Sequence, residues 1–131
     1  MRVIGKLVFS MEAEGTEKGN VRGQGDYEVA ITGLAMPLKT DVILAKDAAN
    51  IVIGLGGITT VKFLQVKAVF DDPDVANATI ELLINDGAGE RTITGTMFLL
   101  LDTDITSIKL TNNSDNTTGS DATIFIDLAG D

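Results

Sequence analysis

Residues Ile58 to Phe70 read Ile-Thr-Thr-Val-Lys-Phe-Leu-Gln-Val-Lys-Ala-Val-Phe, and this stretch decides the fold. β-Branched and aromatic side chains dominate it, and such side chains fit a pleated, half-buried surface. From Leu64 onward apolar residues recur at every second position, which is the periodicity of a β-strand. Val61 and Phe63 have the opposite parity, so the strand is either bulged near Phe63 or covered on both faces. The stretch predicts the central strand of a β-sandwich.

Shorter segments with strand character lie on both sides of this stretch. They are residues 2–10, 27–32, 41–45, 51–53, 79–85, 91–101, 105–110 and 123–128. Turn-forming residues separate them at the short spacing typical of sandwiches and barrels, and no amphipathic helix is evident. Residues 85–89, Asn-Asp-Gly-Ala-Gly, tolerate positive φ and predict a hairpin. We therefore predict an all-β sandwich of about eight strands.

Four local breaks in the strand pattern are also predicted. Met36-Pro37 predicts a bend, because proline keeps the preceding residue out of helical geometry. Residues 46–50 predict either one helical turn or a plain turn. Residues 91–101 predict one long strand that is kinked at Gly95, and Asp102-Thr103-Asp104 predicts the turn that ends it.

The size and composition indicate one globular domain over residues 1–131, with 44% apolar and 22% charged residues. The mean hydropathy of +0.23 is high for a small domain, which indicates either a rich internal core or apolar surface covered by a partner. Residues 12–25 contain four glycines and several charges, and they predict an extended surface loop or an arm that reaches a neighbouring subunit.

The net charge of −9 argues against two classes of partner. It repels nucleic acid phosphate and anionic membrane surfaces, whereas it suits docking on a basic surface. No apolar run approaches the roughly 18 residues of a membrane span, and no basic and apolar leader opens the sequence. We expect neither nucleic acid nor a membrane as a partner.

The sequence contains no histidine and no cysteine. Serine-histidine-aspartate catalysis, histidine-based zinc sites and thiolate chemistry are therefore excluded. Glu12, Glu14, Glu28 and Glu81 are the candidates for the acid pair of a glycoside hydrolase. Glu28 and Glu81 occupy outward strand positions, which indicates solvated surface. We predict that the protein is not an enzyme and has no catalytic residues.

Two further patterns indicate turns and not cofactor sites. Residues 51–57 look like a strand entering a phosphate-binding glycine loop, but residues 58–61 are strand-like where a helix is required. Three oxygen-rich groups offer calcium ligands. They are Asp71, Asp72 and Asp74, then Asp102 and Asp104, and finally Asn112, Asn113, Asp115 and Asn116. Ordinary Asx turns explain all three groups. We predict no cofactor and no metal, with calcium at an aspartate-rich loop left open.

The few aromatic residues indicate an interface more than a ligand platform. Sugar- and base-binding β-domains rely on aromatic platforms, and this chain has one tyrosine, five phenylalanines and no tryptophan. If Ile124 and Ile126 face the core, Phe125 faces outward, and by the same parity Phe98 opposes Leu99. The outward phenylalanines indicate either a subunit contact or a sheet buried on both faces. The candidate interface residues are Phe98, Phe125, Val69, Val3 and Leu7.

The C-terminal half of the chain, residues 59–131, resembles small structural proteins of tailed bacteriophage particles. The pattern consists of residues 58–64 (Ile-Thr-Thr-Val-Lys-Phe-Leu), 84–87 (Ile-Asn-Asp-Gly), 97–101 (Met-Phe-Leu-Leu-Leu), 105–113 (Ile-Thr-Ser-Ile-Lys-Leu-Thr-Asn-Asn) and 122–130 (Ala-Thr-Ile-Phe-Ile-Asp-Leu-Ala-Gly). The resemblance implies a jelly-roll-like sandwich that is often oligomeric, particularly trimeric, and located on the virion surface. It implies no catalytic residues.

This resemblance leads to the expected function of a capsid decoration (cement) protein. Such a protein binds the major capsid protein and copies of itself, as a homotrimer, on the capsid surface of the virion. Apolar faces and an N-terminal arm would bridge capsid subunits, with avidity from several attachment points. The alternatives are a tail, baseplate or fibre component of the virion and, in another class, a carbohydrate-binding domain for host-surface recognition.

Overall fold

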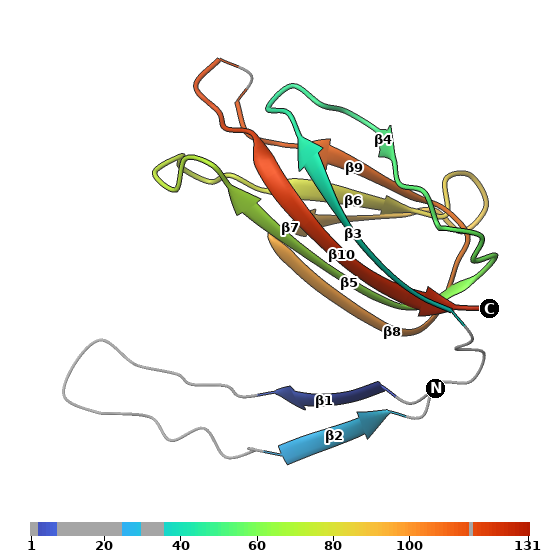
Figure 1. The fold of residues 1–131 in the computed structure, drawn as a ribbon. Coiled ribbons are helices and arrows are strands. Elements are labelled where there is room, and N and C mark those ends of the chain that lie inside the picture. The colour runs from blue at the N-terminus through green and yellow to red at the C-terminus, as the bar shows by residue number, and fades with distance from the viewer. Residues whose placement is uncertain (1–2, 8–24, 30–35, 116) are drawn as a thin grey trace. The chain divides into compact units, whose positions relative to one another are not determined.

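The computed structural model describes residues 3–7, 25–29, 36–115 and 117–131, with side chains from Leu38 onward except those of residues 102 and 116. Within these ranges every regular element is a β-strand, which confirms the all-β prediction (Figure 1). The strands are β1 Val3–Leu7, β2 Gly25–Val29, β3 Met36–Leu44, β4 Ile51–Val52, β5 Val61–Phe70, β6 Ile80–Ile84, β7 Arg91–Gly95, β8 Met97–Ile105, β9 Ile108–Asn112 and β10 Ala122–Gly130.

The chain divides into two compact units, Met1–Ile31 and Thr32–Asp131. In the first unit β1 pairs with β2 as an antiparallel ribbon. The predicted loop or arm at residues 12–25 lies outside the described residues, apart from Gly25 at the start of β2. The second unit contains the other eight strands, so the sandwich is confined to it. Whether residues 1–131 act as one domain stays a prediction.

The second unit is a sandwich of two antiparallel four-stranded sheets, stacked as layers in Figure 1. The first sheet has the order β3-β10-β5-β8 and the second the order β4-β9-β6-β7. Because β5 pairs with β10 on one side and β8 on the other, the prediction of a central strand is confirmed.

The core lies between the two sheets and is built from alternate strand residues. β6 shows the pattern most simply, since Ile80, Leu82 and Ile84 are buried while Glu81 and Leu83 are half-buried on the other side. The largest fully buried side chains are Leu44, Val61, Leu64, Val66, Ile80, Leu82, Ile105, Ile108, Leu110, Ile124, Ile126 and Leu128. Burial of these apolar side chains holds the second unit together.

The change of parity in β5 is caused by a bulge. Phe63 pairs with Ala129 of β10, whereas Val61 pairs with Gly130, so β5 takes two residue steps where β10 takes one. On the other side of β5, Val61 pairs with Ile105 of β8 and Phe63 with Leu101, so β8 is bulged there as well. This irregularity buries Val61 and Leu64 in the same core. Of the two explanations open at the sequence level, the bulge is the one found.

Three of the predicted breaks are wrong. Pro37 lies inside β3 and pairs with Ala129, because β3 is an edge strand where the missing N–H costs no ladder bond. Residues 91–101 are two strands in different sheets, with Thr96 at the corner between β7 and β8. Residues 102–104 belong to β8, in the region of its bulge, and form no turn. Residues 46–50, by contrast, form a plain turn in which the Ala48 amide donates to the Ala45 carbonyl at 2.9 Å.

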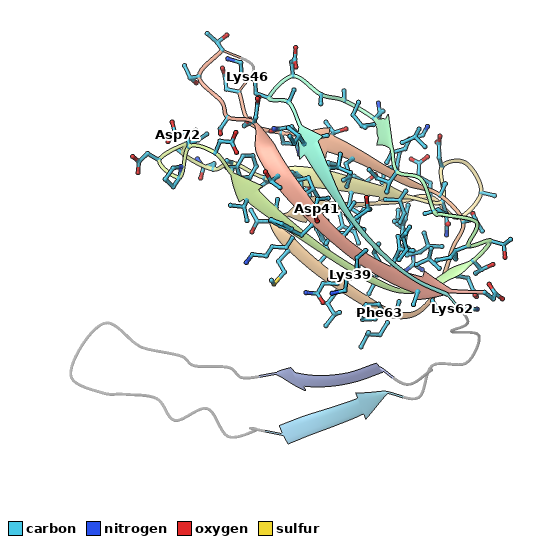
Figure 2. All side chains as sticks on the ribbon, in the orientation of Figure 1. Lys39, Asp41, Lys46, Lys62, Phe63 and Asp72 are labelled. Atoms are coloured by element: carbon cyan, nitrogen blue, oxygen red, sulfur yellow. The ribbon has the colours of Figure 1, made fainter. Side chains whose placement is uncertain are left out.

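Three loops meet at one end of the sandwich, which we call the acidic end. It comprises residues 45–50, 71–79, 113–115 and 117–121, with Lys46 and Asp72 labelled in Figure 2. The Lys46 amide donates to the Asp121 carboxylate at 2.9 Å, and the Asp72 amide donates to the Ser120 hydroxyl at 2.8 Å. Its charged residues are six aspartates and one lysine, so it accounts for −5 of the net charge of −9.

Asn112 fastens the acidic end to the core. Its buried side-chain amide donates to the carbonyls of Leu44 and Ser120 at 3.1 and 2.9 Å, while its oxygen accepts the Ser114 amide at 2.9 Å. One side chain therefore links the end of β3, the end of β9 and the loop before β10. Because buried polar groups are costly unless they are paired, this network fixes the loop in one arrangement.

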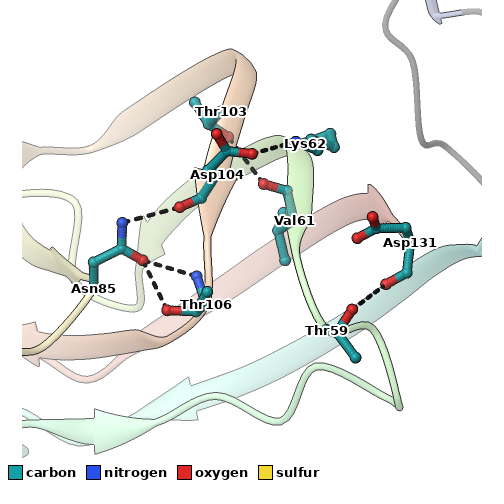
Figure 3. Close-up of polar contacts among 8 residues, drawn as sticks. All are labelled: Thr59, Val61, Lys62, Asn85, Thr103, Asp104, Thr106 and Asp131. Atoms are coloured by element: carbon teal, nitrogen blue, oxygen red, sulfur yellow. Dashed lines mark hydrogen bonds and ion pairs between the residues drawn. The ribbon is translucent and has the colours of Figure 1, made fainter. Parts of the chain in front are cut away.

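Side-chain hydrogen bonds also close the opposite end of the sandwich (Figure 3). Lys62 pairs with Asp104, and the Thr103 hydroxyl donates to the Val61 carbonyl at 3.1 Å, so both bonds tie the bulged part of β8 to β5. The Asn85 amide donates to the Asp104 carbonyl at 3.0 Å. These contacts hold the bulged C-terminal end of β8 against β5 and against the residue that follows β6.

Candidate functional site

The outer face of the β3-β10-β5-β8 sheet carries most of the exposed large apolar side chains of the described part of the chain. We call this surface the apolar face. Its apolar members and their exposed fractions are Ile43 (77%), Met97 (60%), Leu99 (50%), Val69 (43%), Phe125 (41%) and Leu101 (38%), together with the half-buried Phe63. Exposed apolar side chains that gather on one face of a sheet mark an interaction site more often than singly scattered ones do.

The strand register assembles the apolar face from distant parts of the sequence. Phe125 of β10 lies between Asp41 of β3 and Lys67 of β5, and Lys67 in turn lies beside Met97 of β8. In the next row Asp127 lies between Lys39 and Gln65, and Gln65 lies beside Leu99. Cross-strand neighbours on one face of a sheet are about 5 Å apart, so each row is a continuous strip of side chains.

The charged residues of the apolar face balance one another. Lys39 and Asp127 form an ion pair at 3.4 Å, with Lys39 and Asp41 visible on β3 in Figure 2. Lys67 and Asp41 flank Phe125 on opposite sides. Two lysines and two aspartates give the face a formal charge of zero on a chain whose net charge is −9.

The outer face of the other sheet has a different character, and we call it the polar face. Its residues are Val52, Glu81, Leu83, Thr92, Thr94, Lys109 and Thr111, which follow from the register of β4, β9, β6 and β7. Three threonines, one glutamate and one lysine give this face many hydrogen-bonding groups. The sandwich is therefore asymmetric, with one water-compatible side and one apolar side.

The predicted interface residues have different outcomes. Phe125 and Val69 lie on the apolar face, 41% and 43% exposed, so their outward orientation is confirmed. Phe98 is only 6% exposed and belongs to the core, so its predicted outward orientation is wrong. Val3 and Leu7 lie in β1, where only the backbone is described, so their side chains lie outside the described residues.

The error at Phe98 has a local physical cause. All five residues from Met97 to Leu101 are apolar, so the sequence offers two equally apolar parities. The pairing of β8 with β5 decides between them, because Phe98 lies beside the buried Val66 and Leu100 lies beside the buried Leu64. Met97, Leu99 and Leu101 then point outward, and the sequence interpretation missed these three residues.

Within the described residues, polar side chains form turns and surface pairs. The Asp72 carboxylate accepts the Asp74 amide at 2.9 Å, and the Asp115 carboxylate accepts the amides of Thr117 and Thr118 at 2.7 and 2.8 Å. These are the Asx turns that the sequence predicted for the first and third groups, whereas the prediction is wrong for Asp102 and Asp104, which lie in strand β8. No group of three or more potential metal-ligating side chains is found in the part of the chain that the structure describes.

Two carboxylates have a pKa below the ordinary value. The hydrogen bond from Lys109, together with its positive charge, lowers the pKa of Asp86 below its ordinary value. The backbone amides of Thr118 and Thr117 lower the pKa of Asp115 in the same direction. Both shifts favour the ionised form, which suits structural roles; a catalytic acid would need a raised pKa. Glu81 is half-buried on the polar face, while Glu12, Glu14 and the side chain of Glu28 lie outside the described residues.

Two further observations bear on the class of the protein. No helix of the described residues is long and apolar enough to span a membrane. The comparisons with known proteins found no family model, no curated protein and no solved structure that matches the chain.

Proposed function

We propose that this chain is a structural protein of a tailed bacteriophage virion, namely a capsid decoration (cement) protein that binds the outer capsid surface and stabilises the shell. Its partners would be the major capsid protein and copies of itself, as a homotrimer. The observation that carries the proposal is the apolar face, since such a surface is suited to being covered by a partner. The protein would act by binding its partners and would catalyse no reaction.

Two other features support the proposal. The strand orders β3-β10-β5-β8 and β4-β9-β6-β7 describe eight strands in two sheets, which supports the finer proposal of a jelly roll, a fold used by viral capsid proteins. The acidic end, with six aspartates and one lysine, would suit a basic patch on a protein shell and repel the packaged DNA. Several attachment points on one oligomer would give tight binding from weak single contacts.

A co-sedimentation experiment tests the proposal. Purified protein is titrated onto expanded, DNA-free capsids of the phage that encodes the chain, and bound protein is quantified in the pellet. We expect saturable binding at a fixed number of copies per shell, together with a higher disruption temperature of the decorated shells. Absence of binding to expanded shells, with incorporation into purified tails, would reject the decoration role and favour the tail, baseplate or fibre alternative.

The carbohydrate-binding alternative is tested on a glycan array. The described surface has few aromatic platforms, with Phe125 as the most exposed phenylalanine at 41%. We expect no glycan to bind above background. Specific hits that are lost in a Phe125→Ala variant would favour host-surface recognition instead.

A further inference from the structure

We propose that the apolar face is the surface through which copies of this chain associate with one another. The inference rests on the proposed function for its biological meaning, because an oligomer is the form in which a decoration protein would occupy a shell. It assigns the apolar face to the second copy and leaves the acidic end and the polar face for the capsid.

The charge of the face favours a second copy over a partner of opposite charge. Two chains that each carry −9 repel one another, and the repulsion is smallest where the touching surfaces are neutral. The apolar face is neutral, since Lys39 and Lys67 balance Asp41 and Asp127. Because it presents both signs, the lysine of one copy can meet an aspartate of the next. A basic partner would gain more from the acidic end, where the charge is −5.

The size of the face sets the strength of the association. Strands β3 and β10 are nine residues long, and four strands at the usual spacing cover about 550 Å² on each copy. A contact between two such faces would bury about 1,100 Å² in total, which is at the lower limit for a specific interface. We therefore expect reversible association that depends on concentration. On a shell, the high local concentration of the chain would shift this equilibrium to the associated form.

The two edges of the sheet indicate which half of the face is adhesive. Edge strand β3 carries Pro37, Lys39 and Asp41, and proline and charges are the devices that protect an edge from unwanted pairing. Edge strand β8 has no charge between Met97 and Leu101. Its charged residues Asp102 and Asp104 come only at the bulge. We therefore expect the half of the face over β5 and β8, which lacks these protections, to lie at the centre of the contact, with the charged residues of β3 and β10 at its rim.

The association is tested by measuring mass in solution as a function of concentration. Multi-angle light scattering of the full chain from 1 to 200 µM is expected to show a rise from 13.8 kDa toward a defined oligomer. Leu99→Lys places a charge in the apolar half and should weaken association at least tenfold. The matched control is Val52→Lys, since Val52 is an exposed apolar strand residue (68%) on the polar face. Circular dichroism checks that both variants are folded.

A fluorescent label provides a readout that does not depend on a lysine substitution. The chain contains no cysteine, so Leu99→Cys and Val52→Cys each give a single attachment site for the polarity-sensitive dye acrylodan. The emission of the label at position 99 should shift to the blue as concentration rises, because the neighbouring copy excludes water. The label at position 52 should not shift.

The outcomes separate this inference from the proposed function. A wild-type chain that stays monomeric at 200 µM, or a Leu99→Lys variant that associates like wild type, overturns the inference. Capsid binding by a chain that stays monomeric would support the capsid-binding part of the proposed function and reject self-association. Association through the apolar face without any capsid binding would support the inference and reject the proposed capsid-binding function.

Discussion

At the scale of single residues, Asn112 is the side chain whose loss should be most informative. It is 6% exposed and makes three hydrogen bonds across two strands and a loop. Asn112→Ala would leave two carbonyls and one amide without this partner in a buried setting. We expect the free energy of unfolding to fall by about 2–4 kcal/mol, measured by urea denaturation. Asn113→Ala, a change at the exposed neighbour, should stay within about 0.5 kcal/mol of wild type. Equal losses of stability in the two variants would contradict a stabilising role for the hydrogen bonds of the Asn112 side chain.

The ion pair between Asp86 and Lys109 predicts a dependence of stability on pH. Lys109 lowers the pKa of Asp86 in the folded chain, and the ordinary value is 3.8. A lowered folded pKa contributes stability that is present above the ordinary value and is lost as the pH falls through the folded value. Wild type should therefore lose more stability than Asp86→Asn between pH 5 and pH 3, as measured by urea midpoints.

Salt provides the control for this prediction. The pair is partly exposed, with 27% of the Lys109 side chain and 44% of the Asp86 side chain accessible, so 1 M NaCl should reduce the difference between the two proteins. Identical midpoint shifts in wild type and Asp86→Asn, at low and high salt, would show that the pair contributes nothing to folding.

At the scale of elements, the close contact between β10 and the segment before β5 should not tolerate a side chain at position 130. A Cβ atom on Gly130 would lie 1.9 Å from the Thr60 carbonyl oxygen, which accepts the Asp131 amide at 3.2 Å. Gly130→Ala must therefore move the backbone, and we expect a loss of about 1–3 kcal/mol or more. Gly54→Ala has open space around it and should change stability by less than about 1 kcal/mol. Thermal and urea unfolding distinguish these outcomes.

The parity of β6 predicts effects of different size at two adjacent leucines. Leu82 is fully buried between the sheets, whereas Leu83 is half-buried on the polar face. Leu82→Ala should cost about 2–5 kcal/mol because it leaves a cavity in the core. Leu83→Ala should cost about 1 kcal/mol or less. Comparable losses at both positions would mean that the polar face is covered in solution.

The elements that were predicted correctly are those in which apolar and polar residues alternate. In β6 the polar Glu81 lies between Ile80 and Leu82, and the polar Asn85 follows Ile84, so the parity of Ile80, Leu82 and Ile84 is favoured although Leu83 is apolar. The prediction failed where the sequence is apolar on both parities, at residues 97–101. It also failed at Pro37, because nothing local indicates that a strand lies at a sheet edge. Whether a strand lies at a sheet edge, and where the chain passes from one sheet to the other, depend on the strand order of the whole sandwich.

The candidate site was less predictable than the fold for the same reason. Phe125 and Val69 could be assigned outward positions from their own strands. The apolar face as a whole depends on β3, β10, β5 and β8 lying side by side, and its rows join residues as far apart as Asp41 and Phe125. No local pattern in a single sequence fixes pairings over such distances, so the face appears only once the topology is known.

At the scale of the whole molecule, the division into two units predicts that the sandwich folds without the first unit. Among the side chains that the structure describes, which begin at Leu38, the buried residues of the core cluster run from Leu44 to Leu128, within the unit Thr32–Asp131. A chain of residues 32–131 should therefore unfold cooperatively, with a β-type far-UV circular dichroism spectrum and dispersed amide proton resonances. A truncated chain without dispersed resonances would show that residues 1–31 supply part of the folding energy.

The acidic end carries −5 of the net charge of −9 at one end of the strands. Neighbours that associate side by side and point the same way bring their aspartate-rich loops together, whereas neighbours that point in opposite ways keep those loops apart. Since salt shortens the range of this repulsion, to about 3 Å at 1 M, added salt should tighten a ring of parallel copies and leave an antiparallel pair nearly unchanged. The ionic-strength dependence of assembly thus reports the relative orientation of the copies.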